Sequence, residues 1–306
     1  MGRPVLRAAT RGSALAVWQT DFVASLVATE CGVAVERVVV ETAGDLRQDA
    51  HIWEIGGRGV FVKEVQAAVL QGRADFAVHS AKDLPSSVTA GLVIAAVPVR
   101  ADPRDALVGS TLEDLPTGGL VATGSVRRRA QLASLRPDLT FTGLRGNVGT
   151  RLAKASGHAA IVMAAAALDR LDHADRAAEV LDCSVMVPQV GQGALAVEAR
   201  EDDLEVLELL RAVQHGPSRV AVDAERAYLA EIGGGCDLPV GAYARVGGDG
   251  GLHMDAVLGS LDGRIVLRVA GEAGAGAGED LGRALARRLL DECGGAWLLD
   301  GLRSLA

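Results

Sequence analysis

Short β-branched runs alternate with helical patterns along the first two hundred residues, and this rhythm limits the possible folds more than any other feature. Residues 5–9 form a strand-like run, residues 14–31 place apolar side chains on one helical face, and residues 35–41 supply the next strand. Such alternation predicts a largely parallel sheet covered by helices. The same patterns predict further helices at 61–70, 126–135 and 148–155, and further strands at 75–79, 92–99, 120–122, 139–142 and 160–163.

The polar segment ADPRDA, at residues 101–106, interrupts this rhythm, which restarts near Leu120. A chain of 306 residues is also too long for one comfortable core, because domains usually hold roughly 100 to 150 residues. We therefore expect the chain to cross into a second βα domain at this segment.

The pattern changes again from about Ser218, where one helix is predicted through Ile232. Strands follow, separated by the turn signals at 247–251 and 261–263, and an amphipathic helix over 279–293 closes the chain. The fold class predicted from these patterns is α/β, ending in a smaller α+β unit.

The charge balance excludes two classes of partner. The net charge of −8 argues against nucleic acid and anionic membranes, because their general binders need a broad positive field. No apolar run reaches the roughly 18 residues of a membrane span, and the first residues lack the apolar core of a signal peptide. We expect a cytoplasmic protein whose anion sites are local.

The four cysteines lie far apart and form no CxxC or Cys/His cluster, so neither a metal site nor a disulfide framework is predicted. Cys236 differs from the others because it follows three glycines, which leave room for a large group on the thiol. An inert buried role suits Cys31, Cys183 and Cys293 better, since each ends an apolar run.

Three consecutive cations, Arg127 to Arg129, stand at a predicted helix start, where the helix dipole already presents partial positive charge. Because cations at this end destabilise the helix, the arrangement indicates a bound anion, held by the arginines and by the hydroxyls of Thr123 and Ser125. The alternative is a basic turn exposed to solvent. The segment 144–151 repeats the design, with Arg145 and Arg151 flanking glycines. Two such turns indicate a ligand with several carboxylates or phosphates.

Lys82 and Asp83 follow the strand at 75–79, and ligand crevices in doubly wound folds lie at carboxyl ends of strands. Asp83 is therefore a candidate site residue, with a helix cap or Asx turn as the alternative. The glycines around Gln192, in the segment 190–194, suit either a hinge or a close ligand approach. The glycine-rich loop at 55–64 lacks the phosphate-loop order and is interpreted as a mobile lid.

Eight segments taken in order make the chain similar to a known family. They are ATRGSALA, GGRGVFVKE, AVHSAKDLP, DPRDA, TGSVRRRAQL, LRGNVGTRL, VGQGALAVE and GGGCDLPVG. Together they resemble the hydroxymethylbilane synthase family, also called porphobilinogen deaminase, along nearly the whole chain.

The resemblance implies two domains shaped like the lobes of periplasmic solute-binding proteins, formed by 1–98 with 194–212 and by 99–193. It implies a third, α+β domain at 216–306, with a small antiparallel sheet and Cys236 on a loop. It also implies a monomeric transferase of haem and tetrapyrrole biosynthesis, with a dipyrromethane cofactor joined to Cys236 through a thioether. On this primer four porphobilinogen molecules add in turn, each losing ammonia, and hydrolysis releases hydroxymethylbilane.

The resemblance also assigns roles to residues. Positive charge that develops on pyrrole nitrogens needs a carboxylate, and this is the catalytic role implied for Asp83. Guanidinium groups suit the acetate and propionate side chains of the pyrroles. The implied cofactor-binding residues, besides Cys236, are Lys82, Asp83, Thr123, Ser125, Arg127, Arg128, Arg145 and Gln192. The implied substrate-binding residues are Arg11, Ser13, Arg145, Arg151 and Arg170.

Three positions differ from the pattern that the resemblance implies. Arg129 is extra to the arginine pair and is expected on the helix surface. Gly124 stands where the family more often has a hydroxyl residue, and Ala43 where some relatives have an arginine.

Two other functions fit parts of the pattern. A non-enzymatic solute-binding module would use a two-lobed fold and arginine turns, but it leaves Cys236 unexplained. An enzyme acting on phosphosugars or nucleotides would use the same turns, but no complete nucleotide-binding fingerprint is present.

Overall fold

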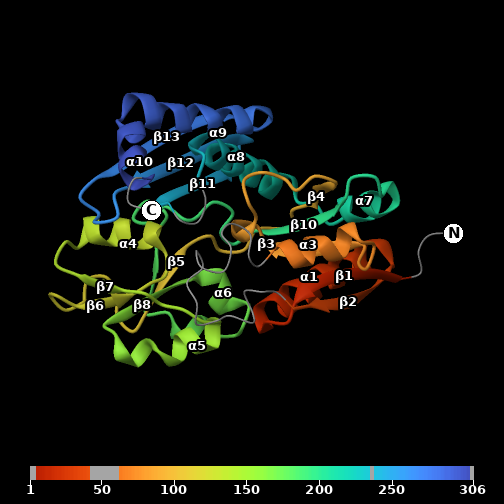
Figure 1. The fold of residues 1–306 in the computed structure, drawn as a ribbon, viewed down its shortest axis with the longest axis horizontal. Coiled ribbons are helices and arrows are strands. Elements are labelled where there is room, and N and C mark those ends of the chain that lie inside the picture. The colour runs from red at the N-terminus through yellow and green to blue at the C-terminus, as the bar shows by residue number, and fades with distance from the viewer. Residues whose placement is uncertain (1–4, 42–61, 235–237, 304–306) are drawn as a thin grey trace. The chain divides into compact units, whose positions relative to one another are not determined.

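The computed structural model describes residues 5–41, 62–234 and 238–303. The chain divides into two compact units, Met1–Ala101 with Ala194–Arg219 and Asp102–Gly193 with Val220–Ala306 (Figure 1). The predicted three-domain division, with its boundaries, stays a prediction.

The first unit is built on a five-stranded mixed sheet in the order β2-β1-β3-β10-β4. Strand β1 (Val5–Arg11) runs parallel to β2 (Ala34–Val40) and to β3 (Phe76–Ser80). Strand β10 (Leu195–Arg200) pairs antiparallel with β3 and with β4 (Leu92–Ala96). The carboxyl ends of β1 and β3 therefore share one edge of the sheet.

Helices cover both faces of this sheet. Helix α1 (Ala14–Cys31) and α7 (Leu204–Arg211) pack in one core cluster with β1, β3 and β10, whereas α3 (Lys63–Leu70) packs in a second cluster with β1 and β3. Ser13 caps the start of α1, and Gly32 ends it with a left-handed φ of 66°. Both helix boundaries are thus set by the local sequence.

The second unit contains another five-stranded mixed sheet, in the order β7-β6-β8-β5-β9. Strand β6 runs parallel to β7 and β8, while β5 pairs antiparallel with β8 and β9. Its strands are β5 (Asp105–Val108), β6 (Leu120–Ala122), β7 (Thr140–Thr142), β8 (Ala160–Ala164) and β9 (Glu179–Leu181), and its helices are α4 (Val126–Leu135), α5 (Val148–Ala153) and α6 (Ala165–Asp169).

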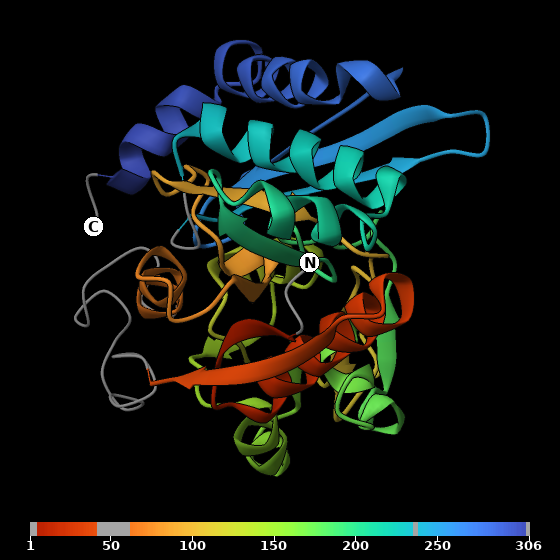
Figure 2. The same ribbon diagram turned by 90° about the vertical axis from the view of Figure 1, so that its right-hand side faces the viewer.

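The C-terminal part of this unit is a three-stranded antiparallel sheet of β11 (Val240–Val246), β12 (Gly251–Gly259) and β13 (Val266–Gly274). Helices α8 (Gly216–Ile232) and α9 (Gly278–Arg287) share its core cluster and run beside each other in Figures 1 and 2. The other neighbour of the sheet is α4, which contacts β12 and β13. Helix α10 (Gly295–Arg303) ends the described chain.

The predicted fold class is confirmed, because two βα sheets precede a small antiparallel sheet. Helices α1 and α4 and strand β6 have the predicted bounds. The sheets are mixed rather than largely parallel, since β10 and β5 enter against their neighbours. No helix within the described residues has the length and hydrophobicity of a membrane span.

The predicted helix over 279–293 is shorter than expected. Helix α9 ends at Arg287, and a π-helical turn over Arg288–Glu292 follows, in which Leu289 is buried. Helix α10, which lies beyond this turn, was not predicted.

Close packing of α9 on α8 yields a testable prediction. A Cβ atom added at Gly282 would lie 2.1 Å from the carbonyl oxygen of Ala224, which is backbone and cannot rotate away. We expect Gly282→Ala to lower the free energy of unfolding by about 1–3 kcal/mol, measured by denaturant titration.

The matched control is Gly301→Ala in α10, where an added Cβ atom meets nothing within 4 Å. Because alanine is the better helix former, this variant should be as stable as the parent or up to about 1 kcal/mol more stable. Equal effects of the two substitutions would contradict the packing argument.

Candidate active site

The first arginine turn joins β6 to α4. Ser125 is the N-cap of α4 and its hydroxyl accepts a hydrogen bond from the backbone N–H of Arg128, at 3.4 Å. The N–H of Ser125 in turn donates to the hydroxyl of Thr123, at 3.2 Å. Both predicted hydroxyl residues therefore shape the turn itself.

Gly124 has a steric reason to lack a side chain. A Cβ atom at this position would lie 2.8 Å from the carbonyl oxygen of Leu144, in the second arginine turn. A residue with a side chain at this position would require the backbone of one turn to shift.

Arg127 and Arg128 point into the protein, where both guanidinium groups meet the fully buried Asp105. Arg127 Nη1 lies 2.8 Å from Asp105 Oδ2, and Arg128 Nη2 lies 2.7 Å from Oδ1. Arg127 Nη1 also donates to the carbonyl of Val187 at 2.7 Å, and Arg128 Nη1 to that of Val162 at 3.0 Å. Arg129 is exposed on the helix surface, as predicted.

The charges in this cluster depend on one another. Burial is the largest influence on the pKa of Asp105 and raises it, but Arg127 and Arg128 together outweigh burial, so the pKa lies well below its usual value. Burial also lowers the pKa of Arg128, opposed by Asp105. A guanidinium stays protonated in proteins, so all three groups are charged at neutral pH.

Gln192 and Arg170 tie the segment 190–194 to the same region. Gln192 Nε2 donates to Asp105 Oδ1 at 2.9 Å and to the carbonyl of Pro103 at 2.7 Å. Arg170 Nη2 donates to the carbonyl of Gly193 at 2.7 Å, and burial lowers the pKa of Arg170 to about 10. This segment is therefore anchored by both predicted residues.

Two donors of Arg127 have no hydrogen-bond partner within the described residues. Its Nε and Nη2 atoms are buried and unpaired, which is costly for a charged group. A carboxylate would supply the missing acceptors, so this donor set fits a carboxylate-bearing group such as dipyrromethane.

The second arginine turn joins β7 to α5. Asn147 is the N-cap of α5, accepting at Oδ1 from the N–H of Thr150 at 2.9 Å. Gly146 has a φ of 111°, which favours glycine, and its carbonyl accepts from Arg151 Nε at 2.7 Å. Arg145 and Arg151 are half-buried. This turn follows a strand parallel to β6, so both arginine turns lie at one edge of the second sheet.

The remaining predicted residues gather at the corresponding edge of the first sheet. Arg11 ends β1, and Ser13 accepts from the N–H of Ala16 as the cap of α1. Lys82 and Asp83 lie in a 3-10 turn directly after β3, where Lys82 is half-buried and Asp83 is exposed. The carboxylate of Asp83 accepts no hydrogen bond from the residues that the structure describes, so the cap and Asx-turn alternatives are not observed.

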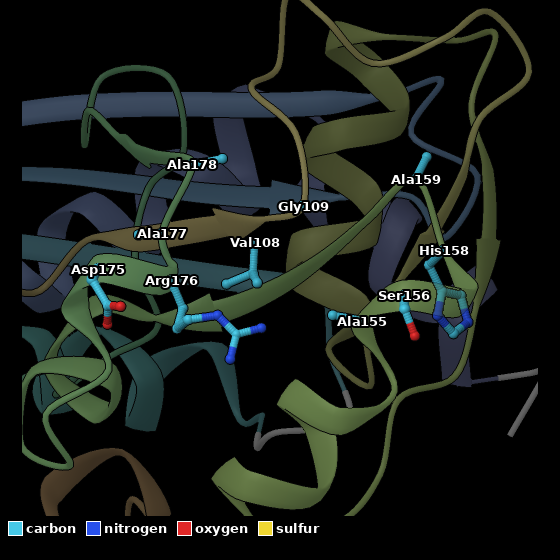
Figure 3. Close-up of a pocket in the computed structure, with 10 residues that line it drawn as sticks. All are labelled: Val108, Gly109, Ala155, Ser156, His158, Ala159, Asp175, Arg176, Ala177 and Ala178. Atoms are coloured by element: carbon cyan, nitrogen blue, oxygen red, sulfur yellow. The ribbon is translucent and has the colours of Figure 1, made fainter.

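A shallow cavity of about 520 Å³ lies elsewhere in the second unit (Figure 3). It is lined by Val108 at the end of β5 and by residues that precede β8, including Ser156 and His158. Because β5 runs antiparallel to β8, this is the edge of the sheet opposite the arginine turns. Ligands of such folds bind outside the carboxyl ends of strands, so we assign no site to this cavity.

Asp105 is the residue that the sequence interpretation missed. The polar segment ADPRDA predicts a crossing between domains, whereas in the structure its second aspartate begins the buried strand β5. Cys236 and most of the predicted lid at 55–64 lie outside the described residues. Within the described part, no group of three acidic, cysteine or histidine residues is placed to hold a metal.

Two family models match this chain. Residues 6–208 match the family model described as porphobilinogen deaminase, dipyromethane cofactor binding domain, and residues 220–291 match the model of the porphobilinogen deaminase C-terminal domain. The chain belongs to the porphobilinogen deaminase family. The resemblance inferred from the eight sequence segments is thereby confirmed, and residues 6–208 form a dipyrromethane cofactor binding domain.

Curated relatives within the family cover nearly the whole chain. The porphobilinogen deaminase of Roseiflexus castenholzii is 49% identical over 98% of this chain and 100% of its own length. That of Roseiflexus sp. strain RS-1 is 48% identical over 95% of this chain and 97% of its own. Among solved structures, the methionine-binding protein MetQ aligns with a TM-score of 0.44 and 13% identity, over 69% of this chain and 91% of that one.

The buried cluster yields a prediction about stability. Asp105→Asn would leave two buried guanidinium groups without a counter-charge, so we expect the free energy of unfolding to fall by about 3–5 kcal/mol in denaturant titration. The exposed Asp175→Asn is the control and should stay within about 0.5 kcal/mol of the parent.

The pH dependence should change as well. Folding lowers the pKa of Asp105. The contribution of Asp105 to the free energy of unfolding is therefore complete above its unfolded pKa of about 3.9, and it is lost as the pH falls through the folded pKa. The parent should therefore lose stability more steeply than Asp105→Asn between about pH 5 and pH 3. Identical slopes would show that Asp105 is not held in its charged form.

Proposed function

We propose that this chain deaminates and polymerises four porphobilinogen molecules head to tail on a dipyrromethane primer, then releases hydroxymethylbilane by hydrolysis. The observation that carries the proposal is the family match over residues 6–208, whose described function is to bind that cofactor. The near-complete coverage of relatives named porphobilinogen deaminase supports it.

The arginine turns support the choice of ligand. Acetate and propionate groups on each pyrrole are planar carboxylates, which guanidinium groups bind through two parallel hydrogen bonds. The unpaired Nε and Nη2 atoms of Arg127 form such a donor pair. We propose that Arg127, Arg128, Arg145, Thr123, Ser125, Gln192 and Lys82 hold the cofactor, with Cys236 as the covalent anchor, and that Arg11, Ser13, Arg145, Arg151 and Arg170 bind the substrate.

The bound cofactor would supply the pyrrole carbon to which the first unit is joined, and the protein supplies charge and orientation. Asp83 is proposed as the catalytic carboxylate that faces the pyrrole nitrogens of the substrate. Its exposure at the carboxyl edge of the first sheet leaves both oxygens open to a ligand, and the adjacent Lys82 offers a cation for a substrate carboxylate. Electrostatic stabilisation of this kind acts on the charge that appears as ammonia leaves.

We further propose that the protein works as a cytoplasmic monomer. A net charge of −8 makes copies of the chain repel one another, which suits a freely diffusing monomer.

Turnover of porphobilinogen tests the proposal directly. The purified protein should release ammonia and a linear tetrapyrrole from porphobilinogen, and Asp83→Ala should slow this by about 100-fold or more, because stabilisation of developing charge is lost. Asp202→Ala, which removes another exposed carboxylate of the first unit, is the control and should keep the parental rate. Capture of porphobilinogen without release of ammonia would instead favour a solute-binding module.

The covalent anchor is tested by mass. Protein made in cells that supply porphobilinogen should weigh more than the bare chain by one dipyrromethane unit, whereas Cys236→Ser should show the bare mass. Cys293→Ser, a half-buried cysteine outside the proposed site, should keep the added mass. If Cys236→Ser keeps the added mass, the cofactor is attached to a residue other than Cys236.

A further inference from the structure

A chain of polar side chains crosses the face of the first sheet that α3 covers. The hydroxyl of Thr89 donates to Gln66 Oε1 at 3.0 Å, and Gln66 Nε2 donates to Glu198 Oε2 at 2.8 Å. His79 Nε2 lies 3.1 Å from the same oxygen of Glu198. The side chains of His79 and Glu198 are only 5% and 2% exposed, so water does not screen this pair.

The strand register explains how the pair meets. On β10 and β3, Glu198 stands opposite Ala77, and Ala196 stands opposite His79. His79 and Glu198 are therefore diagonal neighbours on one face, a spacing that only long side chains bridge. Figure 1 shows α3 beside these two strands.

The surroundings of the pair are apolar. Val65, Val69, Ala77 and Leu92 belong to the core cluster on this face of the sheet. A buried pair of polar side chains is seldom more stable than well-packed apolar residues of similar volume. The His79 ring also lacks hydrogen-bond alignment with Glu198 despite the short distance. Stability alone is therefore a weak reason for these residues to be here.

The position of His79 and Glu198 in the sheet gives a better reason for their presence. His79 precedes the turn that carries Lys82 and Asp83 by two residues, at the end of β3. On the opposite face of β3, Gln19 Nε2 donates to the hydroxyl of Ser80 at 2.9 Å. Between them, the N–H of Ala81 donates to the carbonyl of Ala194 at 3.0 Å. The end of β3 is thus fixed from both faces and from its neighbouring strand.

We propose that Glu198 and His79, with Gln66, are positioning residues for Asp83. This inference rests on the catalytic role proposed for Asp83. The exposed carboxylate of Asp83 accepts no hydrogen bond from the described residues, so its place depends on the backbone of the turn. The buried network fixes that backbone, and a displacement of about 1 Å can cost as much as 100-fold in rate.

The test separates rate from stability. Glu198→Leu removes the carboxylate on which Gln66 and His79 converge, whereas Glu198→Gln keeps an oxygen that can accept from Gln66. Each variant is assayed below its melting temperature, on protein whose intact mass shows the complete primer. We expect kcat to fall about 10- to 100-fold in Glu198→Leu with KM within about twofold, and most of kcat to return in Glu198→Gln.

The matched control removes a buried carboxylate at the start of β3, the end away from the turn that carries Lys82 and Asp83. Asp75 precedes β3 and accepts from the backbone N–H of Arg7 at 2.7 Å and from its Nη2 at 3.0 Å. Asp75→Asn should lower the melting temperature while leaving kcat unchanged. If Glu198→Leu behaves like this control, with a lower melting temperature and a parental kcat, the network is purely structural and the proposal is overturned.

Asp83→Ala, measured in parallel, distinguishes the two levels of the proposal. Slow turnover by Asp83→Ala together with a parental kcat for Glu198→Leu rejects the positioning role alone. Parental turnover by both rejects the role of Asp83 as well. If Glu198→Leu is not recovered as folded protein, His79→Gln replaces it in the same comparison, with the same expected loss of kcat and the same overturning result.

Discussion

The buried contact of Asp105 with Arg127 and Arg128 is the interaction that holds the parts of the second unit together. Asp105 begins β5, and through Arg127 and Arg128 it connects that strand to α4 and to the carbonyls of Val162 and Val187. Without a carboxylate at this point, two cations would be buried with no opposite charge, which is the costly half of a broken ion pair. The cluster of two guanidinium groups and one carboxylate has a net charge of +1, and it also holds Gln192.

Much of this architecture follows from local sequence. The caps at Ser13, Ser125 and Asn147 start their helices in the structure, and periodicity placed α1 and α4. The antiparallel entry of β10 and the π turn after Arg287 depend on pairing and packing between distant segments, which periodicity does not encode.

Part of the candidate site also follows from the sequence, and part of it does not. The rule that ligands bind at the carboxyl ends of strands selected Lys82 and Asp83 from sequence. The arginine turns were selected because cations at a helix start favour a bound anion. Residue type does not say which arginines turn inward, because Arg127, Arg128 and Arg129 are identical and differ only in what surrounds them. The resemblance to the family, and not the residue pattern, placed Arg129 on the helix surface. Asp105 is 22 residues from Arg127 along the chain, and its burial arises only when β5 joins the sheet.

The contact between Gly124 and Leu144 has a consequence for the exchange of parts between relatives. The backbone of one arginine turn fills the space that a side chain in the other would need, so the two turns form a single steric unit. Replacing only the first turn with a serine-bearing version from another member of the family would introduce an atom without room. The two turns would have to be inherited, or engineered, together.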